Sequence, residues 1–248
     1  MSRTAVFALA AAAIVLTPAC AQEKVDTSDR AAVEQIVRDY ILENPEIIEE
    51  ALIALSQRDS AAEQAKARET ILANADALFN NPADYSIGPD DAPVTVVEFF
   101  DYRCSYCKRS MPWATALPDA YDGKVRVVFK EFPILSPESE QASLAAIAAG
   151  KQGKYAEMHV ELMKLDNKSG FGTEEIDAAG KRAGVDVTKM RADMKSMAVQ
   201  KTVADAKSLA RSIGVAGTPN FVVGDTLVPG ADTDAVAALI DAELAKES

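Results

Sequence analysis

The amino-acid sequence predicts an α/β domain with a helical domain inserted in it, preceded by an N-terminal helical arm. Two dense runs of β-branched and aromatic residues, Val94–Phe100 and Val125–Lys130, are typical of buried strands. A long helical stretch over about 136–213 separates them from a short hairpin at Phe221–Val228. Strands on both sides of a helical stretch indicate one sheet with a helical insertion.

The composition is that of an acidic globular protein with enough apolar residues for a core. The 248 residues include 26 Lys and Arg, 38 Asp and Glu and one His, for a net charge of −12, and 48% are hydrophobic. A phosphate backbone demands clustered Lys and Arg, so we expect no nucleic-acid partner. Three cysteines cannot form a disulfide scaffold, and with one histidine they cannot close a zinc site unless carboxylates help. We expect no metal and no cofactor.

The first 21 residues have the pattern of a cleaved export signal. Arg3 supplies a positive charge, and Val6–Leu16 is apolar but too short to span a bilayer. An Ala-Cys-Ala sequence ending at Ala21 fits the cleavage rule, and cleavage there would remove Cys20. Two alternatives remain. The Thr-Pro-Ala-Cys sequence resembles a lipobox, in which Cys20 would be kept and lipidated, and the segment would otherwise be a buried helix. Export predicts an oxidising compartment.

Residues 28–79 have the pattern of helices and carry no strand signal. Apolar residues recur three to four apart over Val33–Ile41 and again over Ile47–Leu55, and Pro45 separates the two stretches. The arm, residues 22–82, has few other residues to pack on. It therefore either folds back on its own domain or pairs between copies as a self-association stalk.

Breaker residues and apolar periodicity predict the remaining elements of the domain at 83–248. A helix from Cys104 to about Leu117 follows the first strand, with a kink expected at Pro112. Gly123 marks the turn before the second strand, and Gly224 marks the turn of the hairpin. Asp232–Lys246, capped by Asp232 or Thr233, closes the chain as a helix with one buried face.

The sequence Cys104-Ser105-Tyr106-Cys107 comes directly after a strand and opens a helix. Two cysteines three residues apart share one face of the first turn and reach disulfide distance. At a helix N-terminus, unpaired N–H groups and the dipole favour the thiolate of Cys104. Cys107 lies one turn deeper. The spacing predicts a redox pair in which Cys104 exchanges with substrate and Cys107 resolves the mixed disulfide. A structural bridge and half of a metal site are the alternatives.

A second motif, Gly-Thr-Pro at 217–219, lies just before the hairpin and about 110 residues after the cysteine pair. The two motifs together resemble the thioredoxin superfamily. The Val-Glu-Phe-Phe sequence at 97–100 and the large helical insertion resemble its DsbA-like branch, from about Pro89 to the C-terminus. The resemblance implies a thioredoxin-like fold, a cis peptide bond before Pro219, and a substrate segment bound by the backbone of Thr218.

The resemblance also implies roles for residues near the cysteines. Glu98 matches the family's buried acid, which implies proton exchange with Cys107; a solvent-facing strand position is the alternative. Lys130, on the adjacent strand, would be a partner for Glu98. The only histidine, His159, falls on an insertion helix and is interpreted as structural.

The dipeptide between the cysteines departs from the DsbA pattern, which often has a histidine there. Ser105 and Tyr106 provide no imidazolium to hold the Cys104 thiolate, so we expect a less oxidising site. The pair resembles the Gly-Tyr of the periplasmic isomerases. With Thr218 and Pro219, these two residues are the expected substrate contacts.

The arm resembles the N-terminal segment of the suppressor-of-copper-sensitivity protein C family over Ile36–Leu55, around its Tyr-Ile-Leu-Glu-Asn-Pro-Glu-Ile sequence. In some members this segment forms a trimeric stalk. The resemblance implies a periplasmic, homotrimeric thiol-disulfide oxidoreductase. It would act mainly as an isomerase or reductase on misoxidised exported proteins, and a membrane redox partner would reset it. A monomeric DsbA-type dithiol oxidase and a copper-binding thiol protein in copper tolerance are the alternatives.

Overall fold

The computed structural model describes residues 29–168 and 170–246, so the predicted signal segment 1–21, with Cys20, lies outside the described residues. The chain comprises two compact units, of which the first ends at Arg58 and the second begins at Asp59. Within the described ranges, no helix combines the length and apolar character that crossing a bilayer requires.

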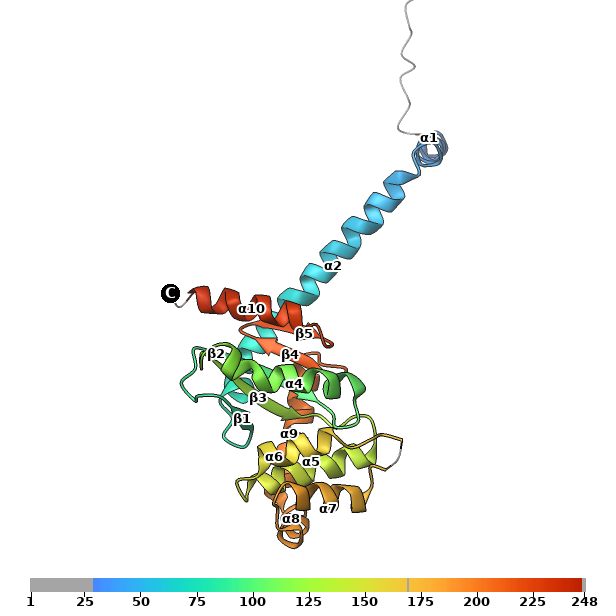
Figure 1. Ribbon diagram of the computed structural model, residues 1–248. Helices are drawn as coiled ribbons and strands as arrows, with labels where there is room; N and C mark the ends of the chain where they lie inside the picture. Colours follow the sequence, from blue (N-terminus) through green and yellow to red (C-terminus); the bar gives the residue numbers. More distant parts are fainter. Residues whose placement is uncertain (1–28, 169, 247–248) are drawn as a thin grey trace, which may run out of the picture. The chain divides into compact units, whose positions relative to one another are not determined.

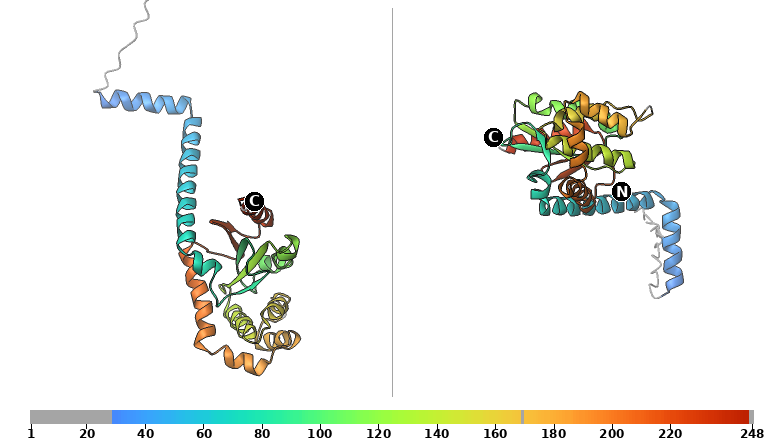
Figure 2. Two further views of the ribbon diagram at one scale, coloured as in Figure 1. Left: turned by 90° about the vertical axis from the view of Figure 1, so that its left-hand side faces the viewer. Right: turned by 90° about the horizontal axis from the view of Figure 1, so that it is seen from below.

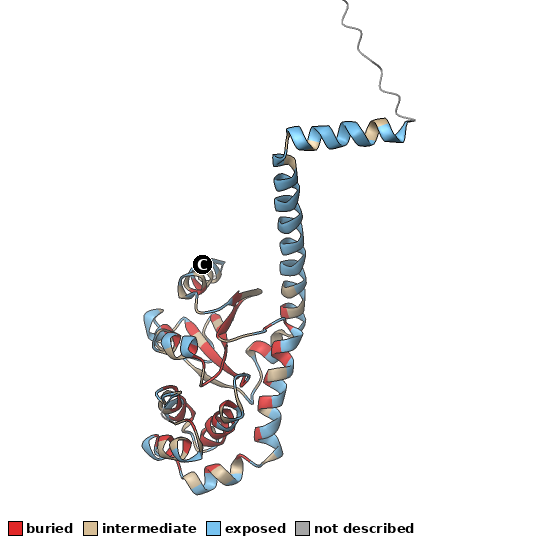
Figure 3. Ribbon diagram, turned by 90° about the vertical axis from the view of Figure 1, so that its right-hand side faces the viewer, coloured by how far each residue is buried: buried red, intermediate tan, exposed pale blue. Residues whose placement is uncertain are grey.

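The N-terminal unit is helical, as the sequence predicts. Helix α1 (Arg30–Glu43) is capped by Asp29, whose carboxylate accepts the N–H groups of Ala31 and Ala32 at 3.0 and 3.3 Å. Helix α2 (Glu46–Ala73) begins after Pro45, at the predicted break. No residue of α1 is buried, and Figure 3 shows exposed residues along most of both helices. The large apolar residues exposed here are Ile36, Val37, Tyr40, Leu42, Ile48, Leu52, Ile53 and Leu55.

A five-stranded mixed sheet forms the centre of the second unit (Figure 1). Its strands are β1 (Tyr85–Ile87), β2 (Val94–Phe100), β3 (Val125–Glu131), β4 (Asn220–Val223) and β5 (Thr226–Pro229), and their order is β1-β3-β2-β4-β5. β2 and β3 are parallel, and every other pair is antiparallel. Four strands confirm the predicted ones. β1 was not predicted, because its three half-buried residues form an edge strand too short to show a period.

Seven helices of the described chain, α4 to α10, follow β2 in the sequence and pack around the sheet, in addition to α3 (Ala75–Phe79) before β1. Helix α4 connects the parallel strands β2 and β3, and α10 follows the hairpin. The predicted helical insertion between β3 and β4 divides into five helices that pack on one another. In Figure 1, α5 to α8 lie at one end of the sheet, and α9 also contacts β3. The bounds are α4 (Ser105–Ala120), α5 (Pro137–Gly150), α6 (Tyr155–Met163), α7 (Thr173–Arg182), α8 (Val187–Asp193), α9 (Met197–Ser212) and α10 (Thr233–Lys246).

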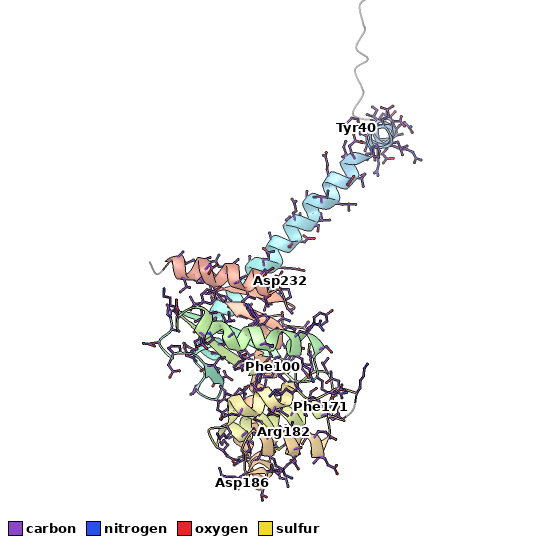
Figure 4. All side chains as sticks on the ribbon, viewed as in Figure 1. Tyr40, Phe100, Phe171, Arg182, Asp186 and Asp232 are labelled. Atoms are coloured by element: carbon purple, nitrogen blue, oxygen red, sulfur yellow. The ribbon has the colours of Figure 1, made fainter. Side chains whose placement is uncertain are left out.

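The sheet buries a separate apolar cluster on each face, and helices cover both faces (Figure 2). Alternate strand residues point to opposite faces. Val96 and Phe100 pack in the cluster that holds residues of α5, α6, α7 and α10, whereas Val97 and Phe99 pack in the cluster that holds residues of α3 and the end of α9. Phe100 lies between the sheet and the insertion helices in Figure 4. Ile71 and Leu78, which fall within residues 22–82, are fully buried in the second cluster.

Lys130 is buried beneath the second cluster, and the sequence prediction of its partner was wrong. It pairs across the ladder with Phe99, so it lies on the face opposite to Glu98. Its ammonium group contacts the buried carboxylate of Asp84 and donates to the carbonyl of Ala77 at 2.5 Å. Burial lowers the pKa of Lys130 and raises that of Asp84, while the contact between the two charges opposes both shifts. The pair ties the segment before β1 to the sheet.

Removing one member of this pair should destabilise the fold more than removing both. Asp84→Ala leaves an uncompensated buried ammonium, so we expect the free energy of unfolding to fall by about 3 kcal/mol or more. The double variant Asp84→Ala/Lys130→Met should lose less, because no buried charge remains. Urea denaturation of the three proteins measures both effects. If the free energy of unfolding of Asp84→Ala is less than about 1 kcal/mol below that of the parent, the assignment of Asp84 as the partner of Lys130 is contradicted.

Candidate active site

The two cysteines lie where β2 gives way to α4. Cys104 is the N-cap of α4, and its sulfur accepts the N–H of Cys107 at 3.5 Å. Its sulfur also lies 3.2 Å from the carbonyl oxygen of Thr218, to which the protonated thiol donates. Both thiols are free, and Cys107 is fully buried, whereas Cys104 keeps 7% of its surface exposed. The deeper position expected for the second cysteine is confirmed.

The sheet brings the second sequence motif to the cysteine pair. The peptide bond between Thr218 and Pro219 is cis, as the resemblance implies. β4 begins at the next residue, Asn220, which lies opposite Phe99 of β2. This register places the start of β4 beside the end of β2. Thr218 therefore contacts Cys104 although 114 residues separate them along the chain.

The environment separates the acidities of the two thiols. Hydrogen bonding from Cys107, helped by the Thr218 side chain and the N–H groups of Cys107 and Tyr106, lowers the pKa of Cys104 to about 5 against the opposing effect of burial. Burial raises the pKa of Cys107, and the hydrogen bond to Cys104 and the charge of Glu98 raise it further. Cys104 is therefore a thiolate at neutral pH, and Cys107 holds its proton.

Glu98 lies within β2, buried on the same face as Val96 and Phe100. Burial raises its pKa to about 8, and the charge of Cys104 acts in the same direction, whereas a hydrogen bond with Ser110 opposes them. Its Oε1 atom has no hydrogen-bond partner among the described residues. The solvent-facing alternative is thereby excluded. Glu98 is a carboxyl group that gains and loses a proton near neutral pH, and it acts electrostatically on both cysteines.

Asp101, which the sequence analysis missed, holds the chain between β2 and the cysteines. One carboxylate oxygen accepts the N–H of Arg103 at 2.8 Å, and the other accepts those of Ile134 and Leu135 at 2.8 and 2.9 Å. Its own carbonyl accepts the N–H of Cys104 at 3.0 Å. An aspartate one residue past a strand and three before a cysteine is a typical cap of such a turn, and that signal was available.

The loop before α7 packs against the start of α4. Asn167 donates to the carbonyl of Arg103 at 2.6 Å, and the Lys108 ammonium donates to the carbonyl of Leu165. The cationic groups of Arg103 and Lys108 lie over the ring of Phe171, 5.8 and 5.1 Å from its centroid. No local sequence signal indicates this contact, because it joins residues more than fifty positions apart.

Ser105 and Tyr106 are on the surface beside the cysteines. The Tyr106 side chain is 59% exposed, and the guanidinium of Arg109 lies 4.1 Å from its ring centroid. Tyr106, Arg109 and Trp113 contribute to a hollow of about 440 Å³ that also reaches the start of α10. The structure therefore brings together Cys104, Cys107, Glu98, Thr218 and Pro219, while His159 lies elsewhere, buried on α6 among aromatic rings.

Titration of the reduced chain should resolve one acidic thiol. The near-ultraviolet absorbance of thiolates should rise with a midpoint at a pH of about 5, and Cys104→Ser should remove this transition. Cys107→Ala should move the midpoint upward, because the hydrogen bond from Cys107 is the largest cause of the low pKa. A midpoint near the usual thiol value of about 8.5 in the parent chain would contradict the geometry.

The buried carboxyl group of Glu98 should lower the free energy of unfolding near neutral pH. Its carboxyl has a pKa of 4.5 when free and about 8 here, so folding takes up a proton between these values and stability falls as the pH rises through them. We expect Glu98→Gln to raise the free energy of unfolding by on the order of 3 kcal/mol at about pH 7, and by little near pH 4. Urea denaturation at both pH values tests this, and a gain of equal size at both would contradict it.

Comparisons with known proteins agree with this geometry. The family model for thioredoxin matches residues 80–242, and that for the copper resistance protein ScsC N-terminal domain matches residues 29–62. The probable disulfide bond formation protein D of Bacillus cereus is 31% identical over 184 residues, which are 68% of this chain and 82% of that protein.

Solved structures extend the comparison. A thioredoxin-like oxidoreductase from Silicibacter pomeroyi is 38% identical and has a TM-score of 0.64, with 70% of this chain and 98% of that chain covered. ScsC of Proteus mirabilis in a transitional conformation is 33% identical and has a TM-score of 0.64, with 90% of this chain and all of that chain covered. The chain belongs to the thioredoxin superfamily, as a DsbA-like thiol-disulfide oxidoreductase with an N-terminal segment of the ScsC type.

Proposed function

We propose that this protein is a periplasmic disulfide isomerase and reductase that acts on misoxidised exported proteins. The observation that carries the thiol-disulfide exchange, which an isomerase and an oxidase share, is the position of Cys104. Its sulfur caps α4, contacts the Thr218 backbone and has a pKa lowered to about 5, so it is a nucleophile at neutral pH. The export pattern of residues 1–21 supports the compartment.

The proposed reaction begins with attack of the Cys104 thiolate on one sulfur of a client disulfide. A bond forms between Cys104 and the client, and the other client sulfur leaves as a thiolate. In isomerisation, that or another client thiolate attacks the mixed disulfide, which releases Cys104 again. In reduction, the thiolate of Cys107 attacks Cys104, the client leaves reduced, and the two electrons it gained are those lost by the cysteine pair.

Glu98 is the proposed proton acceptor for Cys107. The raised pKa of Cys107 keeps it protonated, so it cannot attack until its proton is removed. The carboxylate of Glu98 has a pKa of about 8 and a free Oε1, which suits a group that takes the proton and later returns it. Glu98 would thereby take the proton from Cys107 at the step in which Cys107 attacks the mixed disulfide.

The surface around Cys104 is the proposed client site. Backbone groups at Thr218 and Pro219 would bind an extended client segment through main-chain hydrogen bonds, which tolerate many sequences. Ser105 and the exposed ring of Tyr106 would contact the same segment from the α4 side. A site that reads backbone rather than side chains suits a protein that acts on many clients.

We further propose that the arm assembles three copies of the chain. Supporting this, α1 and the first half of α2 carry exposed apolar side chains such as Ile36, Val37, Leu52 and Leu55. Such a stripe costs free energy in water unless another surface covers it, and a second helix of the same kind would do so. Linked cysteine pairs would raise the effective concentration at one misfolded client. A membrane reductase is the partner expected to reset the pair.

A DsbA-type dithiol oxidase is the second candidate, and the low pKa of Cys104 favours it. A stabilised thiolate favours the reduced pair, which makes the disulfide a stronger oxidant. A weaker oxidant was expected because no histidine lies between the two cysteines. Hydrogen bonds from Cys107 and Thr218 lower the pKa of Cys104 without an imidazole.

Refolding of a scrambled disulfide protein should separate the two candidates. We expect the intact chain to restore activity, and Val37→Asp/Leu52→Asp, which places charges in the exposed stripe, to lose at least about tenfold of that rate and to become monomeric in light scattering. Both the intact chain and the double variant should still oxidise a reduced dithiol peptide.

The control is Gln57→Asp, which adds a charge at an exposed polar position of α2, the helix that carries Leu52, and should keep both properties. If the intact chain fails with scrambled substrate but oxidises the reduced one, the protein is an oxidase. If the stripe variant stays trimeric, the arm does not assemble through these residues.

A further inference from the structure

Three cationic side chains flank the cysteine pair along the chain, and they differ in what they contact. Arg103 pairs with Glu138 at 3.1 Å, and the Lys108 ammonium donates to the carbonyl of Leu165. Arg109 is exposed, and within the described part of the chain no carboxylate or carbonyl oxygen pairs with its guanidinium. The N–H donors of Arg109 are therefore available to a bound molecule.

The Arg109 guanidinium is nevertheless held in one place, by an aromatic ring. It lies 4.1 Å from the ring centroid of Tyr106, which is the residue between the cysteines next to Cys107. Long side chains on a helix lean toward its N-terminus, so this contact brings the charge of Arg109 back toward the cysteine end of α4. A guanidinium stacked on a ring loses less freedom when it binds a carboxylate, and its planar N–H groups suit that partner.

Arg109 and Tyr106 form part of the wall of the hollow of about 440 Å³ beside the cysteines. Trp113 is a second aromatic part of this wall, and its ring packs edge-on against Phe221 of β4, with the ring centroids 5.8 Å apart. Ala231 and Thr233 contribute from the start of α10. The hollow thus combines aromatic surfaces with one available cation.

No acidic side chain among the described residues lines this hollow. Asp232 and Asp234 flank Thr233 in the sequence, but neither is part of the wall, and the carboxylate of Asp232 accepts the N–H of Ala235 at 3.0 Å within α10. The whole chain has a net charge of −12. Arg109 is therefore a local positive charge beside the cysteines of an acidic protein, which suits an anionic group at this point of the surface.

We propose that this hollow receives a Glu or Asp side chain of the client, close to the client's cysteine, and that Arg109 selects it. The inference rests on the proposed function, because a client must be bound at Cys104. Arg109 lies five residues along α4 from Cys104, or about 7.5 Å. An extended client advances about 3.3 Å per residue, so its acidic residue would lie within about three positions of its cysteine. The guanidinium would donate to the carboxylate, and the rings would contact the methylene groups.

Cysteine peptides that carry Glu or Gln at each of these positions in turn test the selection. Each peptide is supplied as its mixed disulfide with pyridine-2-thiol. Attack of the Cys104 thiolate on the peptide sulfur forms the mixed disulfide with Cys104 and releases neutral 2-thiopyridone, whose absorbance gives the rate. Cys107 then attacks Cys104, so the peptide leaves as a thiol and the pair becomes a disulfide. The same peptides with 2-mercaptoethanol give the intrinsic effect of Glu on each disulfide.

After this correction, we expect Glu at one or more positions to react about fivefold faster than Gln, the upper end for an exposed ion pair. Arg109→Gln should lower this ratio to about 1, whereas Arg109→Lys should keep part of it, because the charge remains. Using the ratio within each protein cancels any change in the reactivity of Cys104 itself. The control is Lys124→Gln, which removes one exposed positive charge beyond the other end of α4 and should keep the parent ratio.

The outcomes separate this inference from the function on which it rests. Equal ratios in the parent and Arg109→Gln, or loss of the ratio in Lys124→Gln, would overturn the role of Arg109. A ratio of about 1 at every position in the parent would overturn the selection of acidic clients while leaving thiol-disulfide exchange intact. Failure of every peptide to react with the reduced parent would overturn the proposed function as well.

Discussion

The antiparallel pairing of β2 with β4 is the constraint on which the rest of the site depends. β2 ends at Phe100 and leads into the N-terminus of α4, and β4 begins just after Pro219. With Phe99 opposite Asn220, the two loops meet at one edge of the sheet. All five insertion helices lie between β3 and β4, so they must return the chain to this register for the Cys104 sulfur to meet the Thr218 carbonyl.

The buried ionisable groups of the sheet are satisfied in three different ways. Lys130 has a charged partner, and Glu131 accepts hydrogen bonds from two tyrosines. Glu98, next to the cysteines, has the least support. Among the described residues its Oε1 has no partner, and although Oε2 of Glu131 has none either, Glu98 lacks the two tyrosine donors that Glu131 has. Burial raises the pKa of both glutamates to about 8, yet only Glu98 lies where that affinity for a proton acts on a thiol. The weak hydrogen bonding of Glu98 therefore leaves a proton-binding carboxyl group beside Cys107.

Local patterns predicted the elements that are long or chemically marked. The two central strands, the helix opened by Cys104, the hairpin at Gly224 and the closing helix follow from periodicity and breaker residues. β1 was missed because three edge residues show no period, and the division between α8 and α9 was missed because Ser196 looked like any polar helix residue until it capped α9.

Contacts between distant segments were harder to predict than elements. The predicted pairing of Lys130 with Glu98 was wrong. Lys130 lies opposite Phe99 in the ladder, one position along from Glu98, so the alternation of strand side chains places Lys130 and Glu98 on opposite faces of the sheet. Asp84, its actual partner, precedes a strand that was not foreseen. For the cysteine pair, by contrast, helix geometry alone indicated the acidic and the buried thiol, because both effects arise within one helical turn.

The burial of Cys107 also bears on oxidative damage. Peroxide attacks thiolates, so Cys104 is the sulfur that would become a sulfenic acid. The N–H of Cys107 already lies 3.5 Å from that sulfur, and its thiol would condense with the sulfenic acid, expel water and leave an ordinary disulfide. The buried thiol would thereby protect Cys104 from the irreversible sulfinic and sulfonic forms.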